Sequence, residues 1–252
     1  MHGLTRNSAE FAGLAHRLSE RYRGISVDCL GRGKSEYDTN TANYNPGTYV
    51  QEMVSLLADL DIDQVMLCGT SMGGFMWFIV AATQPARIRG MIINDIGPEI
   101  DQRGLDRIKA YVGKTSPVTT WGEAIQQARE LKAIAFPDFT DDRWLGFTQG
   151  IHRDKGGVPV LAYDAAISQP IDDNEESAVP PDLWPVFDTL DSKPLLVVRG
   201  ESSDILAKTC VSAMQVRKPD LVYAKIPNRG HAPTLNEPAS RLAIDEFLAR
   251  LS

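Results

Sequence analysis

The sequence has few of the residues that would assign it to several large classes of protein. Its three cysteines, Cys29, Cys68 and Cys210, have neither paired spacing nor a C-x-x-C pattern, so nothing predicts a disulfide framework or a zinc site. No apolar run is long enough to span a bilayer, and the first residues lack the charged and then apolar pattern of a signal peptide. We therefore expect a cytoplasmic protein that binds no metal.

Basic residues are also scarce and dispersed. The formal net charge is −7, and no long block of lysine and arginine occurs. A protein that binds nucleic acid or an anionic membrane surface needs such a block or patch, so both partners are disfavoured. We expect a small-molecule partner, and a homodimer is left open.

The 252 residues, 43% of them hydrophobic, suit one large α/β domain. Apolar spacing predicts helices near 11–18, 48–60 and 72–83 and a last amphipathic helix that reaches Leu251, and it predicts strands near 25–30, 65–68, 91–94, 195–198 and 221–226. Strands that alternate with helices indicate a mostly parallel sheet flanked by helices.

The alternation is interrupted after Gly97-Pro98 by helical and irregular segments rich in aromatic residues. We predict a core made of residues 1–99 and 186–252 and a helical cap at 100–185, which ends in a polar stretch from Asp172 to Pro185. Four aromatic residues of this insertion are candidates for an apolar substrate pocket: Trp121, Trp144, Phe147 and Tyr163. The alternative is that they form the insertion's own core.

A serine lies where a predicted strand turns into a predicted helix, in Gly69-Thr70-Ser71-Met72-Gly73-Gly74. This is the pattern of a nucleophile elbow, in which small residues allow a sharp turn that exposes the serine hydroxyl. The helix that follows directs its free N–H groups toward the space in front of Ser71, where an oxyanion would develop. The alternative is a glycine-rich turn with an incidental serine.

A serine nucleophile needs a histidine base and an acid that orients it. His231 follows the predicted strand at 221–226, and Asp204 follows the one at 195–198, so the chain order is Ser, Asp, His. The other histidines are His2, His16 and His152. Two other acids remain alternatives to Asp204: Asp95, which also ends a strand, and Glu201, which shares the loop of Asp204.

A possible nucleotide motif fails on one residue. Gly31-Arg32-Gly33-Lys34-Ser35 matches the end of a phosphate-binding P-loop, which would require glycine at position 28, and Asp28 occupies it. We therefore expect no nucleotide and no other cofactor.

The sequence resembles the α/β-hydrolase superfamily over nearly the whole chain. The segments that carry the resemblance are His2-Gly3-Leu4, Asp28 to Ser35, the elbow, Val198-Arg199-Gly200 with Asp204, and Gly230-His231-Ala232-Pro233. Within that superfamily the sequence resembles the capped carboxylesterases and enol-lactonases. The resemblance implies an oxyanion hole made by the backbone N–H groups of Leu4 and Met72. It also implies that Asp28 to Ser35 is a loop that shapes the site.

The chain departs from this family at its beginning, because the strands that normally precede the His-Gly loop are absent. In the family's sheet, the strand before that loop lies between two other strands, which are equivalent to residues 25–29 and 65–68 of this chain. Neighbouring strands are about 4.8 Å apart, so its loss would leave unpaired backbone groups. We expect an upstream segment, another chain, or direct pairing of the two flanking strands to fill the gap.

The resulting hypothesis is hydrolysis of an uncharged, small to medium carboxylic ester or lactone through an acyl-enzyme on Ser71. A second hypothesis is cleavage of a carbon–carbon bond or an enol-lactone of aromatic degradation, with an anionic substrate bound by arginines of the insertion: Arg103, Arg107, Arg143 and Arg153. A third is a non-catalytic ligand-binding or truncated hydrolase-like protein.

Overall fold

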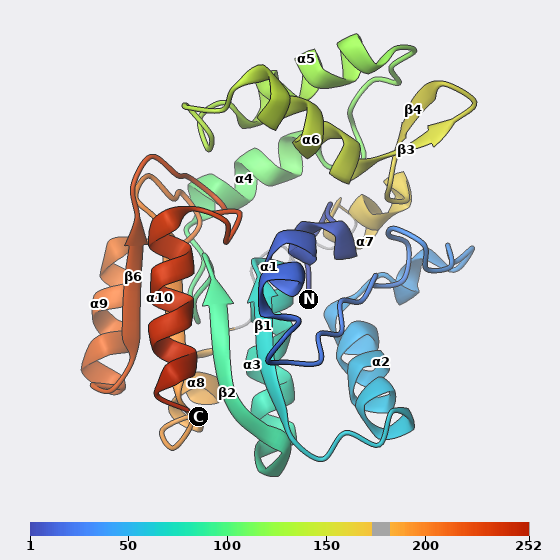
Figure 1. Ribbon diagram of the computed structural model, residues 1–252. Coiled ribbons are helices and arrows are strands. Elements are labelled where there is room, and N and C mark those ends of the chain that lie inside the picture. The colour runs from blue at the N-terminus through green and yellow to red at the C-terminus, as the bar shows by residue number, and fades with distance from the viewer. Residues whose placement is uncertain (173–181, 252) are drawn as a thin grey trace.

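The computed structural model describes residues 1–172 and 182–251, and its centre is a parallel sheet of four strands (Figure 1). The strands stand in the order β1-β2-β5-β6 and comprise β1 (Val65–Thr70), β2 (Ile88–Asn94), β5 (Leu195–Gly200) and β6 (Val222–Ile226). Every residue of β5 is buried, as expected where helices cover both faces of a parallel sheet. The predicted α/β fold is confirmed.

Two apolar layers pack against the two faces of the sheet. Ile93, Leu195 and Val197 belong to the cluster shared with α3 and α9, whereas Leu196 and Val198 belong to the cluster shared with α1 and α10. The alternation follows the two-residue period of a strand. The helices around the sheet are α1 (Ala12–Leu18), α2 (Pro46–Asp59), α3 (Met72–Thr83), α8 (Trp184–Asp188), α9 (Lys208–Arg217) and α10 (Pro238–Ala249).

The segment between β2 and β5, called the insertion below, lies over the carboxyl ends of the strands (Figure 1). It holds α4 (Gln102–Tyr111), α5 (Trp121–Lys132), α6 (Asp141–Ile151), an antiparallel hairpin of β3 (His152–Lys155) and β4 (Val158–Leu161), and α7 (Gln169–Asp172). Short 3-10 helices occupy Ser8–Phe11, Thr41–Asn43, Pro85–Arg87 and Ala165–Ser168. Residues 173–181, within the polar stretch predicted at the end of the insertion, lie outside the described residues.

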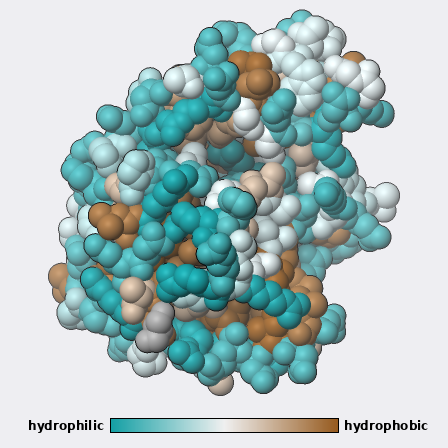
Figure 2. Space-filling view, in the orientation of Figure 1, coloured by the Kyte–Doolittle hydropathy of each residue, from teal (hydrophilic) through white to brown (hydrophobic). Residues whose placement is uncertain are grey.

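Main-chain hydrogen bonds fasten the insertion to two loops of the core. The Gly33 N–H donates to the Ala162 carbonyl at 2.7 Å, and the Asp164 N–H donates to the Gly31 carbonyl at 2.8 Å. The Gly230 N–H, beside His231, donates to the Ala135 carbonyl at 2.9 Å. Between the insertion and the strands the molecular surface is hollowed (Figure 2).

The strand predicted at 25–30 is wrong, because these residues form no strand and pair with none of the strands in the described part of the chain. A strand needs a neighbour for its backbone N–H and C=O groups, and β1 is an edge strand of the described sheet that does not pair with this segment. Instead, Met1 lies beside the end of β1: its nitrogen donates to the Cys68 carbonyl at 2.5 Å, and its carbonyl accepts from Thr70 N at 3.0 Å. This pairing places the loop of Gly3 and Leu4 next to the elbow.

Candidate active site

Ser71 stands between β1 and α3 in a backbone conformation that is rare for any residue but glycine, with φ 52° and ψ −120°. Close packing maintains this strain. A Cβ on Gly69 would lie 2.4 Å from Trp77 Cδ1, and a Cβ on Gly73 would lie 2.2 Å from the Met1 carbonyl oxygen. Only glycine therefore fits at either position without movement of the surrounding chain.

A continuous line of hydrogen bonds joins three side chains at the carboxyl edge of the sheet. Ser71 Oγ lies 2.8 Å from His231 Nε2, and His231 Nδ1 lies 2.9 Å from Asp95 Oδ2. Asp95 is fully buried, and its other oxygen accepts from the Gly200 N–H at 2.8 Å. The carboxylate can hold Nδ1 as the protonated nitrogen, which leaves Nε2 able to accept the serine proton.

Asp204 does not take this position, so the preference for it over Asp95 is wrong. Its carboxylate receives two hydrogen bonds from Arg107 of α4, at 2.5 and 2.8 Å. Burial alone would raise the pKa of Asp204, but the Arg107 guanidinium outweighs burial and the pKa is lowered. Glu201, the other alternative, pairs with Lys225 at 3.0 Å.

The sheet order explains why Asp95 faces the imidazole. Asp95 directly follows β2, which is hydrogen-bonded to β1, whereas Asp204 lies four residues beyond β5. Buried Arg199 holds the loop between β5 and Asp204, because its guanidinium donates to the carbonyl groups of Glu201, Ser203 and Leu206. The loop conformation thus directs Asp204 toward α4.

The loop of Leu4 is supported by a buried cation, Arg32, which was not among the predicted site residues. Arg32 is fully buried and donates to the carbonyls of Leu4, at 3.0 Å, and Leu30, at 2.7 Å, and to the Tyr49 hydroxyl. Its guanidinium also lies 3.9 Å from Met72 Sδ. Arg32 therefore connects the two residues whose N–H groups are the predicted oxyanion donors.

His2 provides a second support for the same loop. Its Nδ1 lies 2.8 Å from the Gly3 carbonyl, and its Nε2 accepts from the Cys29 N–H at 3.0 Å. These two partners require a neutral ring with the proton on Nδ1. Burial lowers the pKa of His2 to about 3, so the ring is neutral near pH 7. The Leu4 N–H makes no hydrogen bond within the described residues, so it is available to a ligand.

The loop that carries His231 is anchored by buried polar side chains. Arg229 pairs with Glu237 at 2.9 Å and with Asp138 of the insertion at 2.5 Å. The Asn94 amide donates to the Pro233 carbonyl at 2.8 Å and to Thr70 Oγ1 at 3.1 Å. Asn94 thereby connects the elbow to the histidine loop.

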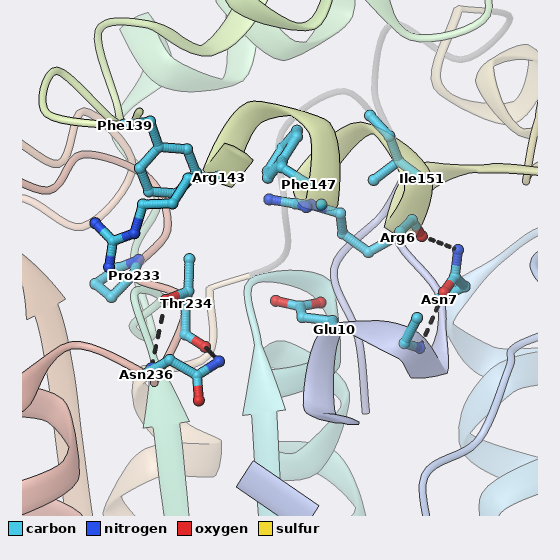
Figure 3. Close-up of a pocket in the computed structure, with 13 residues that line it drawn as sticks. Arg6, Asn7, Glu10, Phe139, Arg143, Phe147, Ile151, Pro233, Thr234 and Asn236 are labelled. Carbon is cyan, nitrogen blue, oxygen red and sulfur yellow. Dashed lines mark hydrogen bonds between the residues drawn. The ribbon is translucent and has the colours of Figure 1, made fainter. Parts of the chain in front are cut away.

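Two cavities lie beside these loops. The larger, of about 260 Å³, lies between α6, the Pro233 loop and the segment after Leu4, and it is lined by Arg6, Glu10, Phe139, Arg143, Phe147 and Thr234 among others (Figure 3). The smaller, of about 40 Å³, is lined by Thr5, Tyr111, Lys132 and Tyr163 among others.

The predicted pocket aromatics divide into two groups. Phe147 lines the larger cavity and Tyr163 the smaller. Trp144 is buried and packs edge-on against Phe136 at 6.2 Å, inside the insertion's own apolar cluster, and it lines neither cavity. Trp121 also lines neither cavity, because its indole packs on His152 and donates to Asp154 at 3.3 Å.

The arginines considered for an anionic substrate are mostly engaged elsewhere. Arg103 is exposed and pairs with Asp101, Arg107 holds Asp204, and Arg153 donates to the Tyr37 hydroxyl. Arg143 lines the larger cavity, 5.2 Å from the Phe139 ring centroid. Arg6 also lines this cavity and was not among the predicted residues. Its position two residues after Leu4 was the only sequence signal for it.

The three cysteines do not supply thiolates near pH 7. Burial raises the pKa of Cys29, Cys68 and Cys210 to about 11, so their thiols are protonated near pH 7. Within residues 1–172 and 182–251, no three histidine, cysteine or acidic side chains converge in a way that could hold a metal ion. None of the helices in this part of the chain combines the length and apolar character needed to cross a membrane.

Comparisons with known proteins identify the family of this chain. The model of the "Alpha/beta hydrolase family" matches residues 1–245. A 3-hydroxybutyrate-oligomer hydrolase of Cupriavidus necator is 31% identical over 98% of this chain and 86% of its own length. A 2-(acetamidomethylene)succinate hydrolase of Mesorhizobium japonicum is 30% identical over 91% of this chain and 79% of its own. The crystal structure of an alpha/beta hydrolase from Novosphingobium aromaticivorans is 38% identical, with a TM-score of 0.93 over 99% of this chain and 88% of that one. The chain is a hydrolase that belongs to the alpha/beta hydrolase family.

Proposed function

We propose that the protein hydrolyses small to medium carboxylic esters or lactones through an acyl-enzyme on Ser71. The observation that carries the proposal is the unbroken line from Ser71 Oγ through the His231 imidazole to the buried Asp95 carboxylate, with contacts of 2.8 and 2.9 Å. In this proposal Asp95 replaces Asp204 as the acid of the triad.

Each proton transfer can be assigned to one of these atoms. Ser71 Oγ attacks the ester carbonyl carbon while His231 Nε2 takes the hydroxyl proton. The oxyanion accepts hydrogen bonds from the Met72 N–H, at the start of α3, and from the Leu4 N–H. The alcohol leaves with the proton from Nε2. A water molecule then attacks the acyl carbon and gives a proton to Nε2. As the bond between the acyl carbon and Ser71 Oγ breaks, Nε2 returns this proton to Oγ and the acid leaves.

The insertion is proposed to act as the cap over this site. Phe147 and Tyr163, each at a cavity wall, would contact the apolar parts of the substrate. A relative named for 3-hydroxybutyrate oligomers supports ester chemistry, because units of a hydroxy acid are joined by ester bonds.

A second candidate keeps the same side chains but changes the bond that is cleaved. One relative is named for 2-(acetamidomethylene)succinate. That compound contains an acetamido group and no ester. This favours the broader hypothesis that Ser71 and His231 act on an activated acyl group other than a simple ester, such as an enol-lactone or a cleavable carbon–carbon bond.

A labelling experiment separates the catalytic proposals from the non-catalytic one. A fluorophosphonate probe should modify the wild-type protein at Ser71 and leave folded Ser71→Ala unlabelled. p-Nitrophenyl esters of increasing chain length, compared with simple lactones, would then define the substrate class. Folded wild-type protein that neither reacts with the probe nor cleaves any of these compounds would contradict the proposal and favour a ligand-binding protein.

A further inference from the structure

Arg6 lies close to Ser71, with Gly3 between them. It follows the loop of Gly3 and Leu4, and a Cβ placed on Gly3 would be 3.6 Å from Arg6 Cγ and also 3.6 Å from Ser71 Cβ. The side chain extends under α6, where its guanidinium carbon is 4.2 Å from the Phe147 ring centroid (Figure 3). The cation thus occupies the space between the elbow and the insertion.

The Arg6 guanidinium has no partner that satisfies its donors. Within the described residues it makes no hydrogen bond and no salt bridge, although a guanidinium offers five N–H donors. Arg6 is half-buried and lines the larger cavity, so its donors can be reached from that cavity, and burial lowers its pKa. A cation in this situation is stabilised when an anion binds to it.

Lys132, the last residue of α5, is a second cation near the same place. Its Nζ donates to the Tyr111 hydroxyl at 2.6 Å, and within the described residues no carboxylate lies within ion-pair distance of it. Burial also lowers the pKa of Lys132. For the Tyr111 phenol, burial raises the pKa, but Lys132, Arg107 and Arg6 together outweigh burial and lower it. Arg6 lines the larger cavity and Lys132 the smaller, and the two cavities share Ile151 as a wall residue.

The neighbouring acids decide where an anion would bind. Arg107 is already neutralised by Asp204. Glu10 lies on the floor of the larger cavity below Arg6, and its carboxylate accepts from the Gly3 N–H at 3.2 Å (Figure 3). The carboxylate of a ligand would be repelled by Glu10 if it bound beside that residue. Between Arg6 and Lys132 it would be attracted by both cations.

We propose that Arg6 and Lys132 form a subsite for a carboxylate of the substrate, so that the preferred esters are acidic ones. The inference rests on the proposed function, and it replaces the uncharged ester expected from the sequence with one that carries a carboxylate in its acyl or alcohol part. Because Arg6 belongs to the core and Lys132 to the insertion, the bound carboxylate would connect the two.

The test compares two matched substrates in each variant. The p-nitrophenyl monoester of glutaric acid carries a carboxylate, and p-nitrophenyl pentanoate is a neutral ester of the same acyl chain length. Wild-type protein should show a higher kcat/KM for the acidic ester. The ratio of the two kcat/KM values should fall about 10- to 100-fold in Arg6→Gln and in Lys132→Met, because each variant loses a charge-assisted hydrogen bond. Arg103→Gln, which removes an exposed arginine of α4, should leave the ratio unchanged.

The outcomes distinguish this inference from the proposed function. Cleavage of both esters with a ratio that Arg6→Gln and Lys132→Met do not alter would overturn the subsite and leave the hydrolase intact. If neither ester is cleaved and Ser71 resists the fluorophosphonate, the proposed function fails, and binding then tests the subsite. Glutarate should raise the Tm of wild-type protein more than glutaramide does, and this difference should disappear in Arg6→Gln. Equal shifts for the two compounds would overturn the inference.

Discussion

The change Asp95→Asn tests the geometry of the triad most directly. Asparagine has nearly the same shape as aspartate and tolerates the positive φ of 61° at this position. The Gly200 N–H, which donates to Asp95 Oδ1 at 2.8 Å, needs an oxygen, so the amide nitrogen must face His231. Nδ1 of His231 then has to accept, and the ring proton moves to Nε2. An Nε2–H group cannot take the proton of Ser71.

The wrong tautomer should lower kcat by about 10⁴-fold, the size of the effect known for the equivalent change in a serine protease. This corresponds to about 5.4 kcal/mol of transition-state stabilisation. The assay is kcat for a p-nitrophenyl ester near pH 8, together with the rate of fluorophosphonate labelling, which should fall in parallel. Circular dichroism and the Tm establish that the variant is folded.

Asp204→Asn is the matched control, because Asp204 also follows a strand at the same edge of the sheet. It removes a partly exposed ion pair with Arg107, whose side chains are 34% and 28% exposed. Such a pair contributes about 0–1 kcal/mol to stability, so the variant should stay folded. Its kcat should stay close to that of wild type, because Asp95 and not Asp204 holds His231 Nδ1. A loss of about 10⁴-fold in Asp204→Asn, with Asp95→Asn close to wild type, would refute the assignment of Asp95.

Three further changes test the supports of the site. Arg32→Met leaves the buried Tyr49 hydroxyl and two partly buried carbonyls without a donor. At about 1–3 kcal/mol for each, it should lower the free energy of unfolding in urea by at least about 3 kcal/mol, and a smaller loss would mean that water replaces the guanidinium. The unfolded chain binds a proton on His2 near pH 6.5 and the folded protein only near pH 3, so stability is lost as the pH falls through this window. His2→Gln should reduce that slope by about 1.4 kcal/mol per pH unit, and equal slopes in urea titrations would contradict a neutral buried His2. Gly73→Ala should displace Met1 and with it the Leu4 N–H, and kcat should therefore fall by about 10²- to 10³-fold. Gly122→Ala on α5 is the control, because its added Cβ would make only ordinary contacts, and it should keep the wild-type kcat.

The elements that could be predicted from the sequence are those fixed by local pattern. The glycines around Ser71 and the apolar helix that follows predict the elbow, and the structure places both there. The strand at 25–30 could not be rejected in this way, because its apolar residues suit a strand and only the lack of a neighbour prevents one. Pairing is a property of the whole chain.

The acid of the triad illustrates the same limit. Asp95 and Asp204 both follow strands, and the sequence does not show that β2 lies next to β1 or that Arg107 approaches Asp204. The choice between the two depends on strand order and on a contact between α4 and a distant loop. Trp144 was misassigned for a related reason, since a large aromatic residue has the same sequence signal in a pocket and in a core.

The backbone links between the insertion and the core have a consequence for how large a substrate can be accepted. Gly31 and Gly33 flank the arginine that supports Leu4, a proposed oxyanion donor, and Gly230 precedes His231, the proposed general base. If the insertion moved outward, its hydrogen bonds would displace the loop of Arg32 and the loop of His231. A wider entrance would therefore disturb the positions of the oxyanion donor and the base. Substrates must then enter by rotation of side chains in the cavity walls. Compounds too large for this route should have a lower kcat as well as a higher KM.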